Sequence, residues 1–280
     1  ALTILKSCVL CPRNCKIDRT AGETGFCKTG RFAKVYSAGP HFGEESPLVG
    51  SKGSGTIFFS SCNLLCCFCQ NHEISFGGAG EETSKENLAE IMLHLQNMGC
   101  HNINLVTPTH VIPQLLEALK PAVESGLEIP LVHNSNGYEN VSTVKLLDGI
   151  IDIYMPDFKF WNPEISKLAL DAEDYPEKAK KALIEMHRQV GILKTDGYGI
   201  AAGGVILRHL VMPENSSDTY SVMKFVAERV SPDTYVNIMS QYRPCYKAGS
   251  VKAFGRPVTT EEYRIALKDA ARARIWNLAR

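Results

Sequence analysis

Three cysteines in one short segment carry the clearest chemistry of this sequence. Residues 61–71 read SCNLLCCFCQN, in which Cys62, Cys66 and Cys69 give the spacing C-x3-C-x2-C. Three thiolates from one loop can hold three irons of a cubane cluster and leave the fourth iron without a protein ligand. An open coordination position is typical of a catalytic metal site, because a substrate or cofactor must bind there. Cys67 fits neither spacing, so we interpret it as a packed neighbour.

A second cysteine motif lies near the N-terminus, where Cys8, Cys11, Cys15 and Cys27 give the spacing C-x2-C-x3-C-x11-C. Four thiolates are enough for a closed tetrahedral zinc site or for a second, fully ligated iron–sulfur cluster. The segment has few large apolar residues, so a metal would help it to fold. The spacing leaves zinc and a cluster equally open, and unliganded thiols are the remaining alternative.

Composition excludes several classes of function. The 280 residues include 30 Lys and Arg against 30 Asp and Glu, so the formal net charge is zero. Because there is no basic surplus, we expect no nucleic-acid partner. Every apolar run is far shorter than the roughly 20 residues that a membrane-spanning helix needs, so we expect no membrane partner. Without a secretory signal, clustered cysteines more often bind metal than form disulfides, and we expect a cytoplasmic protein.

Short apolar runs alternate with amphipathic stretches after residue 50, which predicts six β-α units and a parallel sheet. The expected strands span residues 55–60, 102–106, 129–133, 150–155, 205–211 and 235–239, and the expected helices span 83–99, 111–124, 140–147, 176–190, 217–230 and 260–278. We predict an α/β fold, a partial (β/α)6 TIM-like barrel, with chemistry in the loops after the strands. Two domains are expected: a small Cys-rich metal-binding lobe over 1–50, and the barrel over 51–280.

The strand before Cys62 and the pattern C-N-L-x-C-x-F-C resemble the radical S-adenosylmethionine (radical SAM) superfamily. The alternative interpretation of the three cysteines is a zinc or rubredoxin-like knuckle. The longer string CNLLCCFCQNH is most similar to activating enzymes of the pyruvate formate-lyase type. The N-terminal string CVLCPRNC resembles the start of their uncharacterised relatives. The resemblance implies a [4Fe–4S] cluster whose open iron binds SAM. It also implies one-electron cleavage of SAM to a 5′-deoxyadenosyl radical, which abstracts hydrogen from a substrate.

The resemblance also implies a set of cofactor-contacting residues. Residues 134–137, NSNG, are similar to a turn that approaches the ribose and a bound cation, and residues 155–159, MPDFK, are similar to an element that holds a cation and places a lysine nearby. Alternatively, Asp157 and Lys159 of the second element form a solvated ion pair at a strand end. The implied set comprises Phe68, which would flank the adenine, Asn134, Ser135, Asn136, Asp157, Lys159 and Arg208.

One departure from the family concerns the second strand, after which the family carries Gly-Gly-Glu. Here residues 107–110 read TPTH, which supplies no fixed negative charge for the amino group of SAM. Asn134 likewise replaces a carboxylate of the family's turn. Alternatively, His110 has no contact with a cofactor and simply lies beside the start of a helix. We therefore do not transfer the glycyl-radical activating role on these residues.

The sequence is compatible with several functions. A radical SAM enzyme could act on a glycine of a partner protein, or on a small molecule or peptide. The alternatives are a non-catalytic iron–sulfur electron carrier on a degenerate barrel and a zinc-stabilised interaction protein. By resemblance, reduced flavodoxin or ferredoxin would donate the electron. Gln241, Tyr242 and Cys245 lie near the last strand, where they could face substrate or simply pack.

Overall fold

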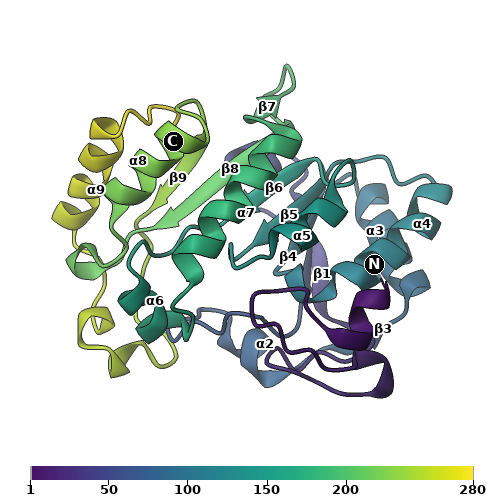
Figure 1. Cartoon of the computed structure of the whole chain (residues 1–280). Coiled ribbons are helices and arrows are strands. Elements are labelled where there is room, and N and C mark those ends of the chain that lie inside the picture. The colour runs from purple at the N-terminus through teal and green to yellow at the C-terminus, as the bar shows by residue number, and fades with distance from the viewer. Residues whose placement is uncertain (1, 280) are drawn as a thin grey trace.

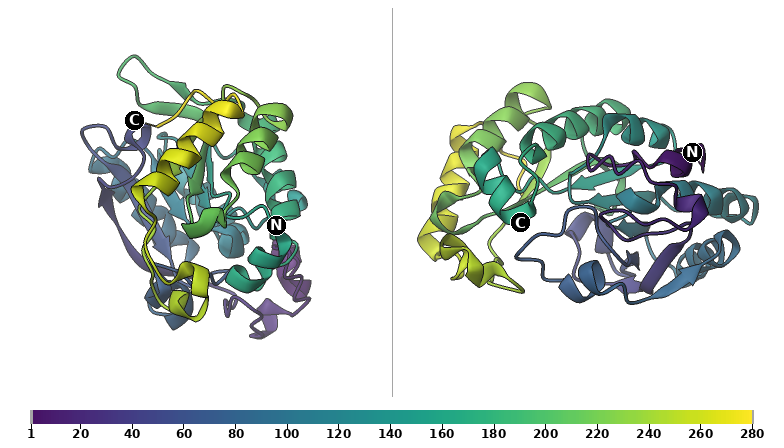
Figure 2. Two further views of the ribbon diagram at one scale, coloured as in Figure 1. Left: turned by 90° about the vertical axis from the view of Figure 1, so that its left-hand side faces the viewer. Right: turned by 60° about the horizontal axis from the view of Figure 1, so that its bottom comes forward.

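The computed structural model describes residues 2–279 and shows a nine-stranded sheet with helices along its outer side (Figures 1 and 2). The strands are β1 Ala33–His41, β2 Ser54–Phe59, β3 Glu81–Thr83, β4 Ile103–Val106, β5 Leu131–Ser135, β6 Ile153–Pro156, β7 Lys194–Thr195, β8 Ala201–Leu210 and β9 Tyr235–Met239. Their order is β3-β1-β2-β4-β5-β6-β8-β7, and β9 pairs with β8.

The centre of the sheet is parallel, as the alternation of strands and helices predicts. β2, β4, β5, β6, β8 and β9 pair in parallel along the sheet. β5 is buried at all five positions, as expected for a strand covered on both faces. Within residues 2–279, no pairing joins β9 to β1 or β2, so the barrel is partial and open on one side. The predicted α/β partial barrel is confirmed.

Helices connect the parallel strands. They are α1 Ser46–Val49, α2 His72–Gly77, α3 Lys85–Asn97, α4 Ile112–Glu124, α5 Val141–Val144, α6 Pro163–Leu170, α7 Tyr175–Val190, α8 Thr219–Arg229 and α9 Thr260–Arg272. Ser84 caps α3, since its hydroxyl oxygen accepts from the Asn87 backbone N–H at 3.1 Å. α9 ends earlier than predicted, because the chain after it returns to β9, where the Val236 N–H donates to the Asn277 carbonyl at 2.9 Å.

The sequence analysis missed β1 and α6. β1 pairs antiparallel with β2, from Val35 opposite Phe59 to His41 opposite Ser54. Residues 33–41, which we expected in the N-terminal lobe, are therefore a strand of the main sheet. Their sequence, AKVYSAGPH, lacks regular apolar alternation because the strand lies at the antiparallel side of the sheet and three consecutive residues are exposed.

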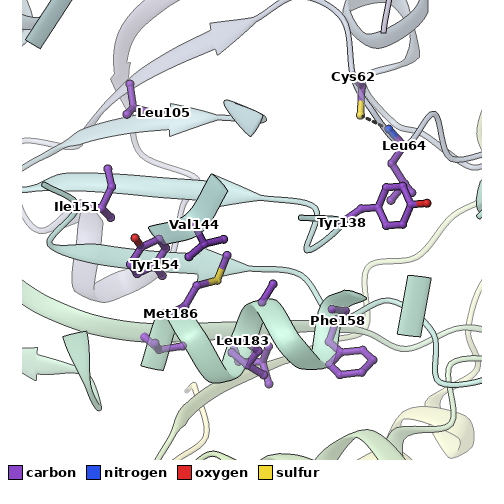
Figure 3. Close-up of a cluster of buried hydrophobic side chains, with 14 of the residues drawn as sticks. Cys62, Leu64, Leu105, Tyr138, Val144, Ile151, Tyr154, Phe158, Leu183 and Met186 are labelled. Carbon is purple, nitrogen blue, oxygen red and sulfur yellow. Dashed lines mark hydrogen bonds between the residues drawn. The ribbon is translucent and has the colours of Figure 1, made fainter. Parts of the chain in front are cut away.

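The largest apolar core lies between the sheet and the outer helices (Figure 3). Tyr154 on β6 packs there with Leu183 and Met186 of α7, each at most 2% exposed. Burying one such side chain stabilises the fold by about 1.5–3 kcal/mol. Leu64, fully buried at the edge of this core, anchors the loop that carries Cys62. Among residues 2–279, no helix is both long and apolar enough to span a bilayer.

Candidate functional site

A cavity of about 440 Å³ lies at the C-terminal ends of the parallel strands. This is where a parallel α/β sheet places its chemistry. Its lining includes all three cysteines of the C-x3-C-x2-C motif and all seven residues of the implied cofactor-contacting set: Cys62, Cys66, Cys69, Phe68, Asn134, Ser135, Asn136, Asp157, Lys159 and Arg208. Residues up to 146 positions apart in the sequence therefore meet at one site. Their individual roles stay predictions.

The three cysteines face the cavity from the loop after β2. Cys62 and Cys66 are buried, and Cys69 is half-buried. The Cys62 Sγ accepts hydrogen bonds from the Leu64 backbone N–H at 3.3 Å (Figure 3) and from Nδ2 of Asn136 at 3.4 Å. Cys67 does not line the cavity, in agreement with its interpretation as a packed neighbour.

The backbone of this loop is held in an unusual conformation. Ser61 and Leu65 have φ values of 77° and 59°, in the left-handed region that side-chain-bearing residues rarely adopt. The strain is offset by buried contacts, among them the hydrogen bond from Nδ2 of Asn63 to the Tyr138 carbonyl at 2.8 Å. Strain of this kind is concentrated at functional sites. It gives the loop a defined shape that presents three thiols to one space.

The thiols fit an iron–sulfur cluster. Burial raises the pKa of both Cys62 and Cys66, although the nearby Lys159 ammonium partly opposes the effect at Cys66. These thiols therefore stay protonated until a cation binds and displaces the protons. The N–H groups directed at Cys62 provide the hydrogen bonds to sulfur that tune a cluster. Three thiols, open cavity space beside them and sulfur-directed donors together match a cluster with one open iron.

An ion network forms one wall of the cavity. Asp157 lies just after β6, and its Oδ1 accepts from Nε of Arg208 at 2.9 Å, while its Oδ2 accepts from Nζ of Lys159 at 2.6 Å. Burial alone would raise the pKa of Asp157, but the two cations hold it below its usual value. Arg208 also donates through Nη2 to Oδ1 of Asn134 at 2.8 Å. Both oxygens of Asp157 are therefore bonded to side-chain cations rather than left for a free one.

The NSNG turn after β5 is shaped by its glycine. Gly137 has a φ of 79°, and a Cβ there would lie 2.2 Å from the Asp157 carbonyl oxygen. Asn136 faces the cluster loop, because its Nδ2 donates to Oδ1 of Asn63 at 2.8 Å as well as to Cys62. Ser135 accepts from the Gly137 N–H at 3.3 Å. The turn thus links the ion network to the cysteine loop.

The TPTH segment after β4 has one residue at the cavity and two residues in the core. Thr107 lines the cavity, whereas the Thr109 hydroxyl donates to the buried Glu139 at 2.9 Å. His110 is 1% exposed and its Nε2 lies 2.8 Å from the Ser60 carbonyl oxygen. Burial lowers the pKa of His110 to about 4. His110 is therefore a neutral core residue.

Glu44 is a cavity residue that the sequence analysis missed. Its Oε2 accepts from Nδ2 of Asn104 at 3.1 Å and lies 3.8 Å from Nη1 of Arg208. Glu44 and Asp157 are the two carboxylates that line the cavity. No sequence signal marks Glu44, because it follows the unpredicted strand β1 and meets Asn104 and Arg208, which are distant in the sequence.

Three further residues of the cavity are Gln241, Tyr242 and Phe68, and the two aromatic side chains are mostly packed against their neighbours. Gln241 lines the cavity. Tyr242 also borders it, but is only 3% exposed and donates its hydroxyl to the Phe254 carbonyl at 2.7 Å. Phe68 is 5% exposed and packs edge-on against Phe160, with ring centroids 5.8 Å apart. Both aromatic rings are thus mainly part of the rim.

The chain is similar to known proteins in sequence and in fold. The family model of the radical SAM superfamily matches residues 56–226. Uncharacterized protein MJ0674 of Methanocaldococcus jannaschii is 34% identical, over 96% of this chain and 75% of that protein. Because the family model matches more than half of the chain, the chain belongs to the radical SAM superfamily. Membership implies S-adenosylmethionine and a [4Fe–4S] cluster as cofactors.

Solved structures share the fold at low identity. Native anSMEcpe with bound AdoMet and Cp18Cys peptide has a TM-score of 0.52 and 13% identity, over 78% of this chain and 60% of that chain. Streptococcus suis SuiB bound to precursor peptide SuiA has a TM-score of 0.52 and 12% identity, over 78% and 46%. The FeFe-hydrogenase maturase HydG from Carboxydothermus hydrogenoformans has a TM-score of 0.50 and 14% identity, over 78% and 50%. This chain spans about half the length of these solved chains.

Proposed function

We propose that this protein cleaves SAM reductively at a [4Fe–4S] cluster held by Cys62, Cys66 and Cys69, and that the resulting 5′-deoxyadenosyl radical abstracts hydrogen from a substrate. The observation that carries the proposal is the single cavity that joins these cysteines to the predicted cofactor-contacting residues. The protein's part is to position the reactants and exclude water.

The chain's own residues divide this work. Asn136 orients Cys62 through its amide, and the Lys159 ammonium lies close enough to Cys66 to favour the thiolate. Arg208 and Lys159 offer positive charge to a carboxylate. Glu44 supplies a fixed negative charge for an ammonium group, which the TPTH segment does not provide. The Glu44 carboxylate would therefore replace the negative charge that is lost with the family's Gly-Gly-Glu.

One candidate substrate is a glycine of a partner protein. Its support is the open side of the barrel between the β1–β3 edge and β9, through which a protein loop could approach. A small molecule or peptide is the second candidate, favoured by the Glu44–Arg208 pair on the cavity wall, which suits a small polar group. Reduced flavodoxin or ferredoxin is the proposed electron donor. The N-terminal cysteines are proposed to bind zinc or a second cluster.

The test is an anaerobic assay with reconstituted protein, dithionite and SAM, in which 5′-deoxyadenosine and methionine are quantified by mass spectrometry. We expect both products from wild type and from Cys67→Ala, and neither from Cys66→Ala. Cys67 is the matched control because it is an adjacent cysteine outside the cavity. Product from Cys66→Ala at the wild-type rate would overturn the proposal. A cluster-loaded wild type that is reduced but yields no product would favour an electron carrier.

A further inference from the structure

The four N-terminal cysteines converge although they are spread over 20 residues. Cys8, Cys11, Cys15 and Cys27 line one small cavity, together with Arg19 and His110. Cys8 and Cys11 are buried, and Cys8 belongs to a small apolar cluster with Leu5 and Leu10. The Cys15 Sγ accepts from the Phe26 backbone N–H at 3.5 Å. Thiols and a sulfur-directed donor are thus gathered in one place outside the main cavity.

Arg19 shows that this second cavity needs negative charge. Its side chain is 1% exposed. Nε donates to the Gly30 carbonyl at 2.9 Å and Nη1 to the His110 carbonyl at 2.8 Å. Nη2 is buried and has no hydrogen-bond partner among residues 2–279. A buried guanidinium with an unsatisfied N–H is costly unless an anion lies beside it. Metal-bound thiolates in the cavity would provide that anion.

The arrangement of the sulfurs favours a cluster over zinc. Four ligands of one zinc ion converge on a single point at about 2.3 Å. Within residues 2–279, no three His, Cys, Asp or Glu side chains are arranged as ligands of a single ion. In a cubane each thiolate binds a different iron, so the sulfurs surround a wider space. Neither the N-terminal cysteines nor Cys62, Cys66 and Cys69 are gathered as ligands of a single ion in the described part of the chain.

Arg13 joins this motif to the loop after β2 that carries Cys62, Cys66 and Cys69, called the catalytic loop below. It lies between Cys11 and Cys15, and its Nε donates to the Asn63 carbonyl at 3.0 Å, while Nη2 donates to the Leu64 carbonyl at 3.2 Å. Its guanidinium carbon also lies 3.7 Å from the centroid of the Phe26 ring. One arginine of the N-terminal motif therefore holds the backbone between Cys62 and Cys66.

Arg19 provides a second link from the same motif. It binds the backbone of His110, and Nε2 of His110 contacts the carbonyl of Ser60, two residues before Cys62. The chain around Cys62 is thus held at Ser60, Asn63 and Leu64 by side chains that reach back to the N-terminal motif. Loss of order around Cys8–Cys27 would reach Cys62 through these side-chain-to-backbone hydrogen bonds.

We propose that Cys8, Cys11, Cys15 and Cys27 ligate a second iron–sulfur cluster, and that the segment folded around it positions the catalytic cysteine loop through Arg13. The cluster is closed, with four thiolate ligands, and Arg19 donates to it. Arg13 is a positioning residue, since it touches carbonyl groups of the loop. The positioning role rests on the proposed function of Cys62–Cys69, whereas the second cluster does not.

Metal analysis tests the second cluster directly. The variant Cys62→Ala/Cys66→Ala/Cys69→Ala is reconstituted anaerobically with iron and sulfide in the presence of equimolar zinc. We expect about four irons and four sulfides per chain in this variant and about eight of each in wild type. About one zinc without iron, or no metal at all, would overturn the proposal. Should the triple variant not fold, a wild-type content of about four irons overturns it equally. The result is independent of whether SAM is cleaved.

Arg13→Gln tests the positioning role, with Arg31→Gln as the matched control. Arg31 forms a half-buried ion pair with Glu117 at 2.8 Å in the same part of the chain. We expect Arg13→Gln to keep the wild-type iron content, to change the EPR spectrum of the catalytic cluster and to weaken SAM binding about tenfold, the loss expected for charge-assisted hydrogen bonds. The N-terminal cluster signal, recorded in the triple-cysteine background, should not change. Equal behaviour of the two arginine variants would overturn the positioning role.

Discussion

Asp157 and Arg208 join two neighbouring strands of the barrel at its catalytic end. The Asp157 Oδ1 accepts from Nε of Arg208 at 2.9 Å, and Lys159 occupies the other carboxylate oxygen. With Glu44 included, the charged cavity wall carries two carboxylates against these two cations, so their formal charges cancel. The wall therefore offers both positive and negative groups to a zwitterionic ligand, such as the amino-acid end of SAM.

Replacing Asp157 by Asn should destabilise the protein strongly. The change leaves Arg208 and Lys159, whose side chains are only 17% and 14% exposed, with one acceptor fewer. Removing one partner of a fully buried pair costs about 3–5 kcal/mol, which is the upper limit for this cavity wall. Anaerobic urea unfolding measures the loss. Glu177→Gln is the control, because the Glu177–Lys181 pair is exposed and such pairs contribute at most about 1 kcal/mol. Equal effects of the two substitutions would refute this account of the ion network.

Two buried histidines predict a loss of stability in mild acid. Burial lowers the pKa of His110 and of His209 from 6.5 to about 4. Between these values the unfolded chain binds protons that the folded chain does not, so stability falls as pH drops from 6.5 toward 4. The slope is about 1.4 kcal/mol per pH unit for each histidine.

The contribution of His209 to this slope can be isolated. Unfolding free energies at pH 7, 6 and 5 should fall less steeply in His209→Gln than in wild type. His94 lies exposed on α3, so His94→Gln should retain the wild-type slope. A wild-type slope in His209→Gln would show that folding does not lower the pKa of His209.

Gly137→Ala should destabilise the protein more than Gly149→Ala does. Its Cβ would lie 2.2 Å from the Asp157 carbonyl oxygen, in addition to the cost of about 1–2 kcal/mol for a left-handed alanine. Gly149 is the matched control, since its φ is 74° and a Cβ there meets nothing within 4 Å. Unfolding measurements on both variants should give a clearly larger loss for Gly137→Ala. A similar loss at the two positions would contradict the close approach.

Asn136→Ala should lower the reduction potential of the catalytic cluster. Hydrogen bonds to sulfur favour the reduced, more negative cluster. For a bond worth about 1 kcal/mol, its loss shifts a one-electron potential by roughly 40 mV. An EPR-monitored redox titration measures the shift. Ser135→Ala is the control, because Ser135 accepts from Gly137 and has no hydrogen bond to a cysteine. A potential that is unchanged in Asn136→Ala would refute the role of the amide.

The sequence was informative where chemistry depends on local spacing. Cys62, Cys66 and Cys69 lie in one loop, and the strand–helix alternation around them is set by short-range periodicity. Glu44 and Arg13 could not be found in this way. Glu44 reaches the cavity through β1, an irregular strand without apolar alternation. Arg13 acts on Asn63, 50 positions away, through a backbone carbonyl that carries no sequence signature.

The central claim, a three-thiolate cluster whose open iron binds SAM, is tested most directly by EPR of the reduced protein. Wild type is measured beside the Cys62→Ala/Cys66→Ala/Cys69→Ala variant, which keeps only the N-terminal cysteines and supplies the background signal. We predict that SAM changes the spectrum of wild type but not that of the variant, whereas 5′-methylthioadenosine, which lacks the amino and carboxylate groups, changes neither. A wild-type spectrum that SAM leaves unchanged would contradict the account.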